Sequence, residues 1–184
     1  MNSQFPLNFQ TDRLQIQELS TSDMENFYSL ESIPEVVRYQ DWSPRSRAQA
    51  ATLVQDIVDN QSKFPRTLVE LAVIKKDENA FIGRVGAKID HGISKADIWF
   101  SFMPSAQGKG FATEAMEALI TTLTTNFDVT ELEIECDPRN TGSWRLAERL
   151  GFEKVKDIER AWESKGEWVG SRVYMKNLRT ADDG

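Results

Sequence analysis

Hydrophobic and polar residues alternate in the middle of the chain, and the spacing then becomes helical. Ile98, Phe100 and Phe102 occupy every second position, which predicts a β-strand, and Pro104 ends it. Beyond a turn at residues 107–110, the spacing predicts one face of a helix, with apolar residues at positions 112, 115, 116, 119, 120 and 123. We therefore expect a strand, a tight turn and a helix, with the rest of the chain organised around them.

The turn between this strand and this helix is rich in glycine. Gly108 and Gly110 allow the backbone to turn tightly and to approach a bound group closely. Because a helix N-terminus presents free N–H groups and the positive end of its dipole, the turn predicts a phosphate-binding site. The sequence lacks the G-x-x-x-x-G-K-[ST] motif of the P-loop, and Thr113 replaces the third glycine of the dinucleotide fingerprint.

The same patterns, applied to the whole chain, predict a mixed sheet with helices on its faces. Apolar runs predict strands near residues 13–19, 68–75, 81–89, 96–103, 132–136, 152–158 and 168–176. Short turns between the second, third and fourth of these favour an antiparallel meander, whereas the helix before the fifth favours a parallel crossover. The predicted fold class is α+β, with a mostly antiparallel sheet.

Capping residues predict where three other helices begin. Ser22 with Glu25, and Ser46 with Gln49, have the spacing of capping boxes. Asn140 is a good N-cap for a later helix. The segment between the first two of these helices is expected to be irregular.

Length and composition are those of a soluble globular protein. The 184 residues suit a single domain, predicted over residues 11–179 with flexible ends at 1–10 and 180–184. A net charge of −7 argues against a nucleic-acid surface and is compatible with amine ligands. The single cysteine, Cys136, excludes an internal disulfide and a cysteine-built metal site. With no recognisable signal peptide or membrane span, a cytoplasmic protein is expected.

Two motifs carry a family resemblance. The pattern Q-x-x-G-x-A at residues 107–112 resembles the acyl-CoA pyrophosphate loop of the GNAT-superfamily N-acetyltransferases. Residues 140–152, where Asn140 leads a helix that ends in Gly-Phe, are similar to a second motif of that superfamily. The motifs occur in the family's order with a strand between them, so the chain is identified as a GNAT-superfamily member.

Within the superfamily, residues 13–19 and 39–44 resemble the RimJ/RimL branch, whose members acetylate ribosomal-protein N-termini and other amines. The resemblance implies transfer of an acetyl group from acetyl-CoA to a primary amine by direct attack in a ternary complex. The acceptor would be a protein N-terminal α-amine or a small-molecule amine. The resemblance further implies acetyl-CoA as cosubstrate and no metal, and it permits a homodimer.

The resemblance also implies where acetyl-CoA binds. The central strand and the strand at residues 132–136 are expected to splay apart, with pantetheine pairing with the backbone near Phe102 and Met103. Asn140 would both cap its helix and contact pantetheine. The pyrophosphate would lie among the residues of the glycine turn, namely Gln107, Gly108, Lys109, Gly110, Phe111, Ala112 and Thr113.

The family resemblance also bears on which residues are candidates for catalysis. Many relatives use a tyrosine seven residues after the motif asparagine as general acid, but this chain has Ala147 there. In the RimJ/RimL branch a serine at the position of Ser143 hydrogen-bonds the CoA sulfur, so Ser143 is expected to stabilise or protonate the thiolate. An α-amine has an ordinary pKa of about 7.7–8.0, so water or a weak base would suffice. Glu135, whose strand borders the expected splay, is the first candidate base, and the alternatives are Glu70, Asp97, Glu133 and Asp137.

Four further residues bear on the site. Trp42 is expected to wall the acceptor pocket, because this segment does so in related folds. His91 is expected to be a turn residue, and Cys136 a small buried hydrophobe. Gly170 stands where RimJ/RimL-like sequences often have aspartate, so substrate recognition is expected to differ from theirs.

Two other functions have to be weighed. A nicotinamide-dinucleotide enzyme is disfavoured by the missing third glycine and by the single βαβ unit. A non-catalytic acyl-CoA-binding protein of the same fold is allowed by Ala147 and opposed by Ser143. Turnover of acetyl-CoA with amines, compared with binding alone, separates this alternative from an enzyme.

Overall fold

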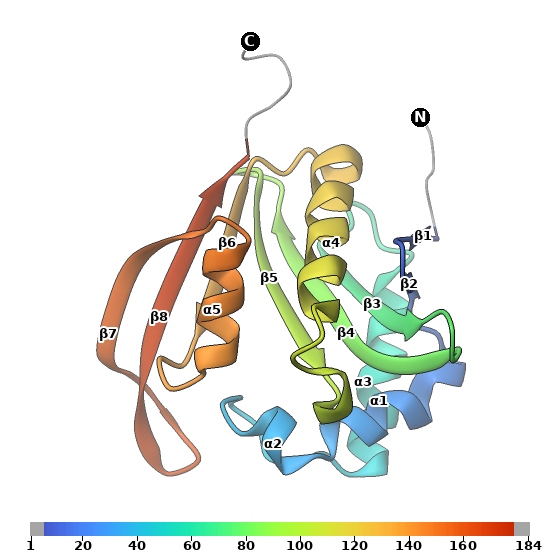
Figure 1. Ribbon diagram of the computed structural model, residues 1–184, viewed down its shortest axis with the longest axis horizontal. Coiled ribbons are helices and arrows are strands. Elements are labelled where there is room, and N and C mark those ends of the chain that lie inside the picture. The colour runs from blue at the N-terminus through green and yellow to red at the C-terminus, as the bar shows by residue number, and fades with distance from the viewer. Residues whose placement is uncertain (1–5, 179–184) are drawn as a thin grey trace.

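The structure, a computed structural model, describes residues 6–178 and contains one eight-stranded sheet with helices on both faces (Figure 1). The strands are β1 (Asn8–Gln10), β2 (Leu14–Glu18), β3 (Leu68–Lys75), β4 (Ala80–Asp90), β5 (Lys95–Phe102), β6 (Glu131–Cys136), β7 (Glu153–Ser164) and β8 (Glu167–Asn177). The helices are α1 (Met24–Glu31), α2 (Pro34–Val37), α3 (Arg47–Asn60), α4 (Phe111–Phe127) and α5 (Thr141–Arg149). The expected α+β class is confirmed.

Strand order explains where the sheet opens. The order across the sheet is β1-β2-β3-β4-β5-β6-β8-β7, and β5 with β6 is the parallel pair. These two strands pair only from Lys95, opposite Glu131, to Asp97, opposite Glu133. Because β5 continues to Phe102 and β6 to Cys136, the two strands diverge beyond Asp97, as Figure 1 shows. The predicted splay is confirmed.

The two faces of the sheet are covered by different helices (Figure 1). On one face, Val69, Leu71 and Val73 of β3 belong to the core that α4 and α5 cover. On the other face, Ala72 packs with Phe27 of α1 and with residues of α3. Side chains alternate along a strand, so Glu70 of β3 lies on the face covered by α1 and α3.

The closing strands form a longer hairpin than the sequence predicts. A loop was expected between residues 158 and 168, but β7 and β8 continue and meet at a tight turn. Its two residues, Lys165 and Gly166, have φ of 51° and 80°. Lys165 Nζ donates to the carbonyl oxygen of Val37 at 2.8 Å, so the hairpin tip is held against α2.

Three local expectations are corrected. The first capping box lies two residues earlier, because residues 21–23 form a 3₁₀ turn before α1: the Ser20 N–H donates to Asp23 Oδ2 at 2.8 Å. Asn8–Gln10 is not a flexible terminus but strand β1, paired with β2. The segment expected to be irregular contains the short helix α2, which begins at Pro34.

Two further points concern the ends of the chain and membrane-spanning helices. Flexible ends were predicted at residues 1–10 and 180–184, and residues 1–5 and 180–184 of these lie outside the described residues. None of the helices in residues 6–178 combines the length and apolarity that a membrane crossing requires.

Candidate active site

The glycine turn forms an open cradle at the start of α4. Gly108 and Gly110 have φ of 72° and 81°, a left-handed conformation that favours glycine, and Gly110 is the N-cap of the helix. Within the described residues, no acceptor bonds the backbone N–H groups of residues 108–113. These free N–H groups and the positive end of the helix dipole suit a pyrophosphate.

Arg13 of the N-terminal region holds the cradle in place. Its Nη1 donates to the Lys109 carbonyl oxygen at 2.9 Å, and its Nε pairs with Glu114 Oε2 at 2.7 Å. Lys109 itself donates from Nζ to the Ser105 carbonyl oxygen at 2.9 Å, rather than extending from the turn. Gln107 donates to the Phe102 carbonyl oxygen at 3.1 Å. Arg13 was predicted only as part of a strand motif, and this anchoring role was missed.

The backbone of β5 distinguishes the two residues predicted to contact pantetheine. The Met103 N–H donates to the Ile82 carbonyl oxygen at 2.8 Å, so it points toward β4. Successive residues of a strand direct their N–H and C=O groups to opposite sides, so those of Phe100 and Phe102 face the splay. The Phe102 N–H therefore suits the predicted contact, whereas the Phe102 carbonyl oxygen already accepts from Gln107 and the Met103 N–H is already occupied.

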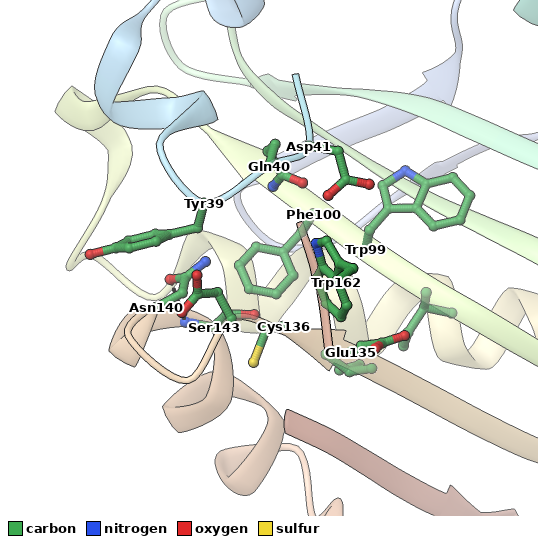
Figure 2. A pocket seen from close by; sticks show the side chains of 13 residues that line it. Tyr39, Gln40, Asp41, Trp99, Phe100, Glu135, Cys136, Asn140, Ser143 and Trp162 are labelled. Atoms are coloured by element: carbon green, nitrogen blue, oxygen red, sulfur yellow. Dashed lines mark hydrogen bonds between the residues drawn. The ribbon is translucent and has the colours of Figure 1, made fainter. Parts of the chain in front are cut away.

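A cavity of about 360 Å³ lies where β5 and β6 diverge. Figure 2 shows Asn140, Ser143 and Cys136 on one side of it and Glu135 near Trp162. Its other lining residues come from the loop after α2 and from the two strands, namely Tyr39, Gln40, Asp41, Ile98, Trp99, Phe100, Ile134 and Asp137. The splay thus brings the two predicted catalytic residues, Ser143 and Glu135, into one cavity. Trp162 was not predicted there, whereas Asp41 belongs to the segment around Trp42 that was expected to wall the acceptor pocket.

Ser143 lies in the first turn of α5, beside a sulfur atom. Asn140 caps this helix as predicted, because its Oδ1 accepts from the Ser143 N–H at 3.3 Å. Ser143 and Cys136 line the same side of the cavity (Figure 2). Burial raises the pKa of Cys136 to about 11, and the Ser143 hydroxyl acts in the opposite direction, since it favours the thiolate. Ser143 is thus placed to stabilise a negatively charged sulfur.

We predict that Cys136 reacts slowly with a thiol reagent such as DTNB in the native protein. At about pH 8, a thiol of pKa about 11 is ionised in only about one molecule in a thousand, and the thiolate is the reactive form. The side chain is also only 8% exposed. The measurement is the time course of reagent release, with the unfolded chain as control. Rapid stoichiometric reaction of the native protein would contradict both the burial and the raised pKa.

Glu135 is the predicted base that borders the cavity most openly. It is exposed, and its Oε1 accepts a hydrogen bond from the fully buried hydroxyl of Ser171, which fixes its orientation. Asp137 also lines the cavity. Burial opposes ionisation of Asp137, but the bonds from Arg139 lower its pKa, which makes it a weak base.

The other candidate acids lie away from this cavity. Glu133 pairs with Lys95 at 2.5 Å, at the closed end of the β5–β6 pair, and Asp97 lies beside them. Glu70 lines a neighbouring cavity, together with Trp42. Trp42 does not line the first cavity.

Two residues singled out in the sequence have structural explanations. The ring of His91 hydrogen-bonds the Arg66 carbonyl oxygen at 2.8 Å, which fits the expected turn residue. A Cβ at Gly170 would lie 2.9 Å from the Ile158 carbonyl oxygen and 3.2 Å from Pro138. Glycine is thus required here by the close packing of the β7–β8 hairpin. No set of three His, Cys, Asp or Glu side chains within residues 6–178 could hold a metal ion.

A comparison with models of protein families identifies the family of this chain. The model of the acetyltransferase (GNAT) domain matches residues 13–153. The chain belongs to the GNAT acetyltransferase family. The uncharacterised N-acetyltransferase p20 of Bacillus licheniformis is 30% identical over 173 residues, which is 91% of this chain and 93% of p20. Family membership confirms the prediction that the chain is an N-acetyltransferase and that acetyl-CoA is its cosubstrate.

Solved structures of other GNAT acetyltransferases share the fold. The microcin C7 self-immunity acetyltransferase MccE, in complex with acetyl-CoA and AMP, matches with a TM-score of 0.80 and 22% identity, over 91% of this chain and 94% of that chain. RimL, a ribosomal L7/L12 alpha-N-protein acetyltransferase in complex with coenzyme A, matches with a TM-score of 0.82 and 19% identity, over 91% of this chain and 96% of that chain. Both likenesses show the fold.

Proposed function

We propose that this GNAT enzyme acetylates a primary amine by direct attack in a ternary complex, inside the cavity between β5 and β6. Ser143 stabilises or protonates the leaving thiolate, and Glu135 accepts the proton of the amine. The observation that carries this proposal is the position of Ser143 in the first turn of α5, where it lines the same cavity as Glu135. A hydroxyl on this wall can stabilise a thiolate that forms within the cavity.

The cradle and the cavity would bind different parts of acetyl-CoA. The free N–H groups at residues 108–113 would hold the pyrophosphate, with Gln107 and Lys109 supporting the turn. The backbone of Phe100 and Phe102 would pair with pantetheine, and Asn140 would contact it from α5. Acetyl-CoA supplies the activated thioester in this arrangement.

The chain's own residues then account for both proton movements. As the amine nitrogen forms its bond to the carbonyl carbon, the carbon–sulfur bond breaks and the sulfur keeps the electron pair. Ser143 donates a hydrogen bond to that sulfur, or gives it its proton and regains one from solvent. Glu135, oriented by Ser171, takes the proton that the nitrogen releases, either directly or through water. An α-amine needs little help from a base because its ordinary pKa is about 7.7–8.0. A protein N-terminus and a small-molecule amine are therefore both suitable acceptors.

Replacing Ser143 with alanine tests the proposal. A hydrogen bond to a charged group contributes about 1.5–3 kcal/mol, so kcat is expected to fall roughly 10- to 150-fold. Affinity for acetyl-CoA, measured as the rise in Tm that it causes, should change little. The matched control is Thr141→Ala, which removes an exposed hydroxyl from the same helical turn and should keep full turnover. The assay follows thiol release with a panel of primary amines, and unchanged turnover in Ser143→Ala would remove Ser143 from the mechanism.

A non-catalytic acyl-CoA-binding role is the second candidate. It is favoured by Ala147, which occupies the place of the general-acid tyrosine and is fully buried in the core. A wild-type protein that gains stability from acetyl-CoA but releases no thiol with any amine would establish this role instead.

Assembly and location stay predictions. We propose a homodimer, and we propose that an acidic chain, with a pI of about 4.9, binds no nucleic acid and works in the cytoplasm. Light scattering checks the first point and a binding assay with DNA and RNA the second.

A further inference from the structure

A second cavity, of about 330 Å³, adjoins the first on the face of the sheet covered by α1 and α3. The two cavities share Gln40 and Trp99 in their walls. Apolar side chains from α1 and α3, among them Phe27 and Leu53, line much of the second cavity. A molecule whose reacting end lies in the first cavity could therefore extend an apolar stem past Trp99 into the second.

Glu70 of β3 gives this cavity an unusual polar group. Its Oε1 accepts two hydrogen bonds, from Arg84 Nη1 and from Trp99 Nε1, each at 2.8 Å. Its Oε2 is buried and has no hydrogen-bond partner in the described structure. The residue is only 6% exposed. A buried carboxylate oxygen without a donor is costly, and a ligand with a donor can remove that cost.

The charged groups around Glu70 also favour a positively charged ligand. Glu31, which shares Arg84 with Glu70, is fully bonded: Oε1 accepts from Arg84 Nη2 at 2.8 Å, and Oε2 accepts from Arg45 Nε at 3.1 Å. Asp56 of α3 adds a third carboxylate in the wall. Two buried carboxylates, Glu31 and Glu70, and the exposed Asp56 thus face two guanidinium groups, those of Arg84 and Arg45. Burial raises the pKa of Glu70, and a cation beside its unbonded oxygen would oppose that effect and balance the group.

We propose that the second cavity binds a second cationic group of the amine acceptor, with Glu70 as its charged partner. The favoured substrate class is an amine that carries an ammonium or guanidinium group at the far end of an apolar stem. Trp42 and Trp99 provide aromatic surface beside that group. This inference rests on the proposed function, since it assigns the acceptor of that same site.

The kinetic test compares 1,5-diaminopentane with pentylamine, which has the same stem but no second charge. The diamine is expected to have a kcat/KM at least about tenfold higher, because a charge-assisted bond to a desolvated carboxylate is strong. Glu70→Gln keeps the side-chain shape and removes the charge, and it should bring the ratio of the two kcat/KM values close to one. The matched control is Glu18→Gln, which changes a partly buried carboxylate paired with Arg66 outside both cavities and should keep the wild-type ratio.

A binding measurement separates this inference from the proposed function. In the absence of acetyl-CoA, the diamine should raise the Tm of the wild type and of Glu18→Gln more than pentylamine does, and should not do so for Glu70→Gln. Asp56→Asn, at the exposed wall, gives a second variant if Glu70→Gln unfolds, and it should reduce the diamine effect. Turnover of amines with no diamine preference in either assay overturns the inference and leaves the proposed function intact. Diamine binding that depends on Glu70, without any turnover, supports the inference and overturns the proposed function.

Discussion

Replacing Arg84 with methionine is expected to lower the free energy of unfolding by about 3–5 kcal/mol, the largest effect of any single substitution considered for this chain. Arg84 is 6% exposed and bonds two buried carboxylates, Glu31 and Glu70. Burial opposes its charge, but both carboxylates raise the pKa of Arg84, so it stays ionised. Methionine would leave Glu70 with only the bond from Trp99, and Glu31 with its other donors but one charge too many.

Urea denaturation followed by circular dichroism measures this loss. The matched control is Arg47→Met, which removes an exposed ion pair with Glu25. Both of those side chains are more than half exposed, so the control should lose less than about 1 kcal/mol. A comparable small loss in Arg84→Met would show that the buried charges are not coupled in the way described.

Gly110→Val is expected to abolish most of the binding of acetyl-CoA. Valine is β-branched and strained at a φ of 81°, and its Cβ would lie 3.3 Å from Arg13 Nη2, the side chain that anchors the turn. Distortion of the turn misdirects the free N–H groups. At about 100 times the wild-type dissociation constant, acetyl-CoA should stabilise the wild type by about 2.7 kcal/mol, whereas a hundredfold weaker variant gains only about 0.4 kcal/mol.

Thermal unfolding with and without acetyl-CoA measures this difference, and NADH serves as the control ligand. Gly166→Val is the matched variant, because Gly166 has a φ of 80° at the hairpin tip with open space around its Cβ position. It carries the same backbone strain but lies outside the cradle, so it should keep the full gain from acetyl-CoA. An equal gain in Gly110→Val would mean that the cosubstrate does not depend on this turn.

Local signals explain what the sequence predicted well. The alternation in β5 and the helical spacing in α4 depend on neighbouring residues, so both elements and the turn between them follow from pattern alone. The cap formed by Asn140 and the position of Ser143 three residues later are equally local. The splay needed more than periodicity, and only the family resemblance supplied it.

Non-local contacts explain what the sequence did not predict. Residues of β7 are mostly exposed and lack period-two alternation. The strand is held by its pairing with β8, which local sequence does not reveal, so the length of β7 was underestimated. The occupied N–H of Met103 depends on where β4 lies. Likewise, Trp42 lines the second cavity, and the division into two cavities depends on Gln40 and Trp99, which come from separate parts of the chain.

The anchoring of the cradle by Arg13 also bears on how the chain matures. Arg13 bonds Lys109 and Glu114 across sequence separations of 96 and 101 residues. During synthesis, Arg13 therefore leaves the ribosome long before its partners exist, and closing so large a loop costs conformational entropy. The phosphate cradle can reach its final shape only after the N-terminal strand has docked against the first turn of α4. Competence to bind acetyl-CoA is thus a late property of the folding chain, and a truncated product lacking either end of this contact would not sequester the cosubstrate.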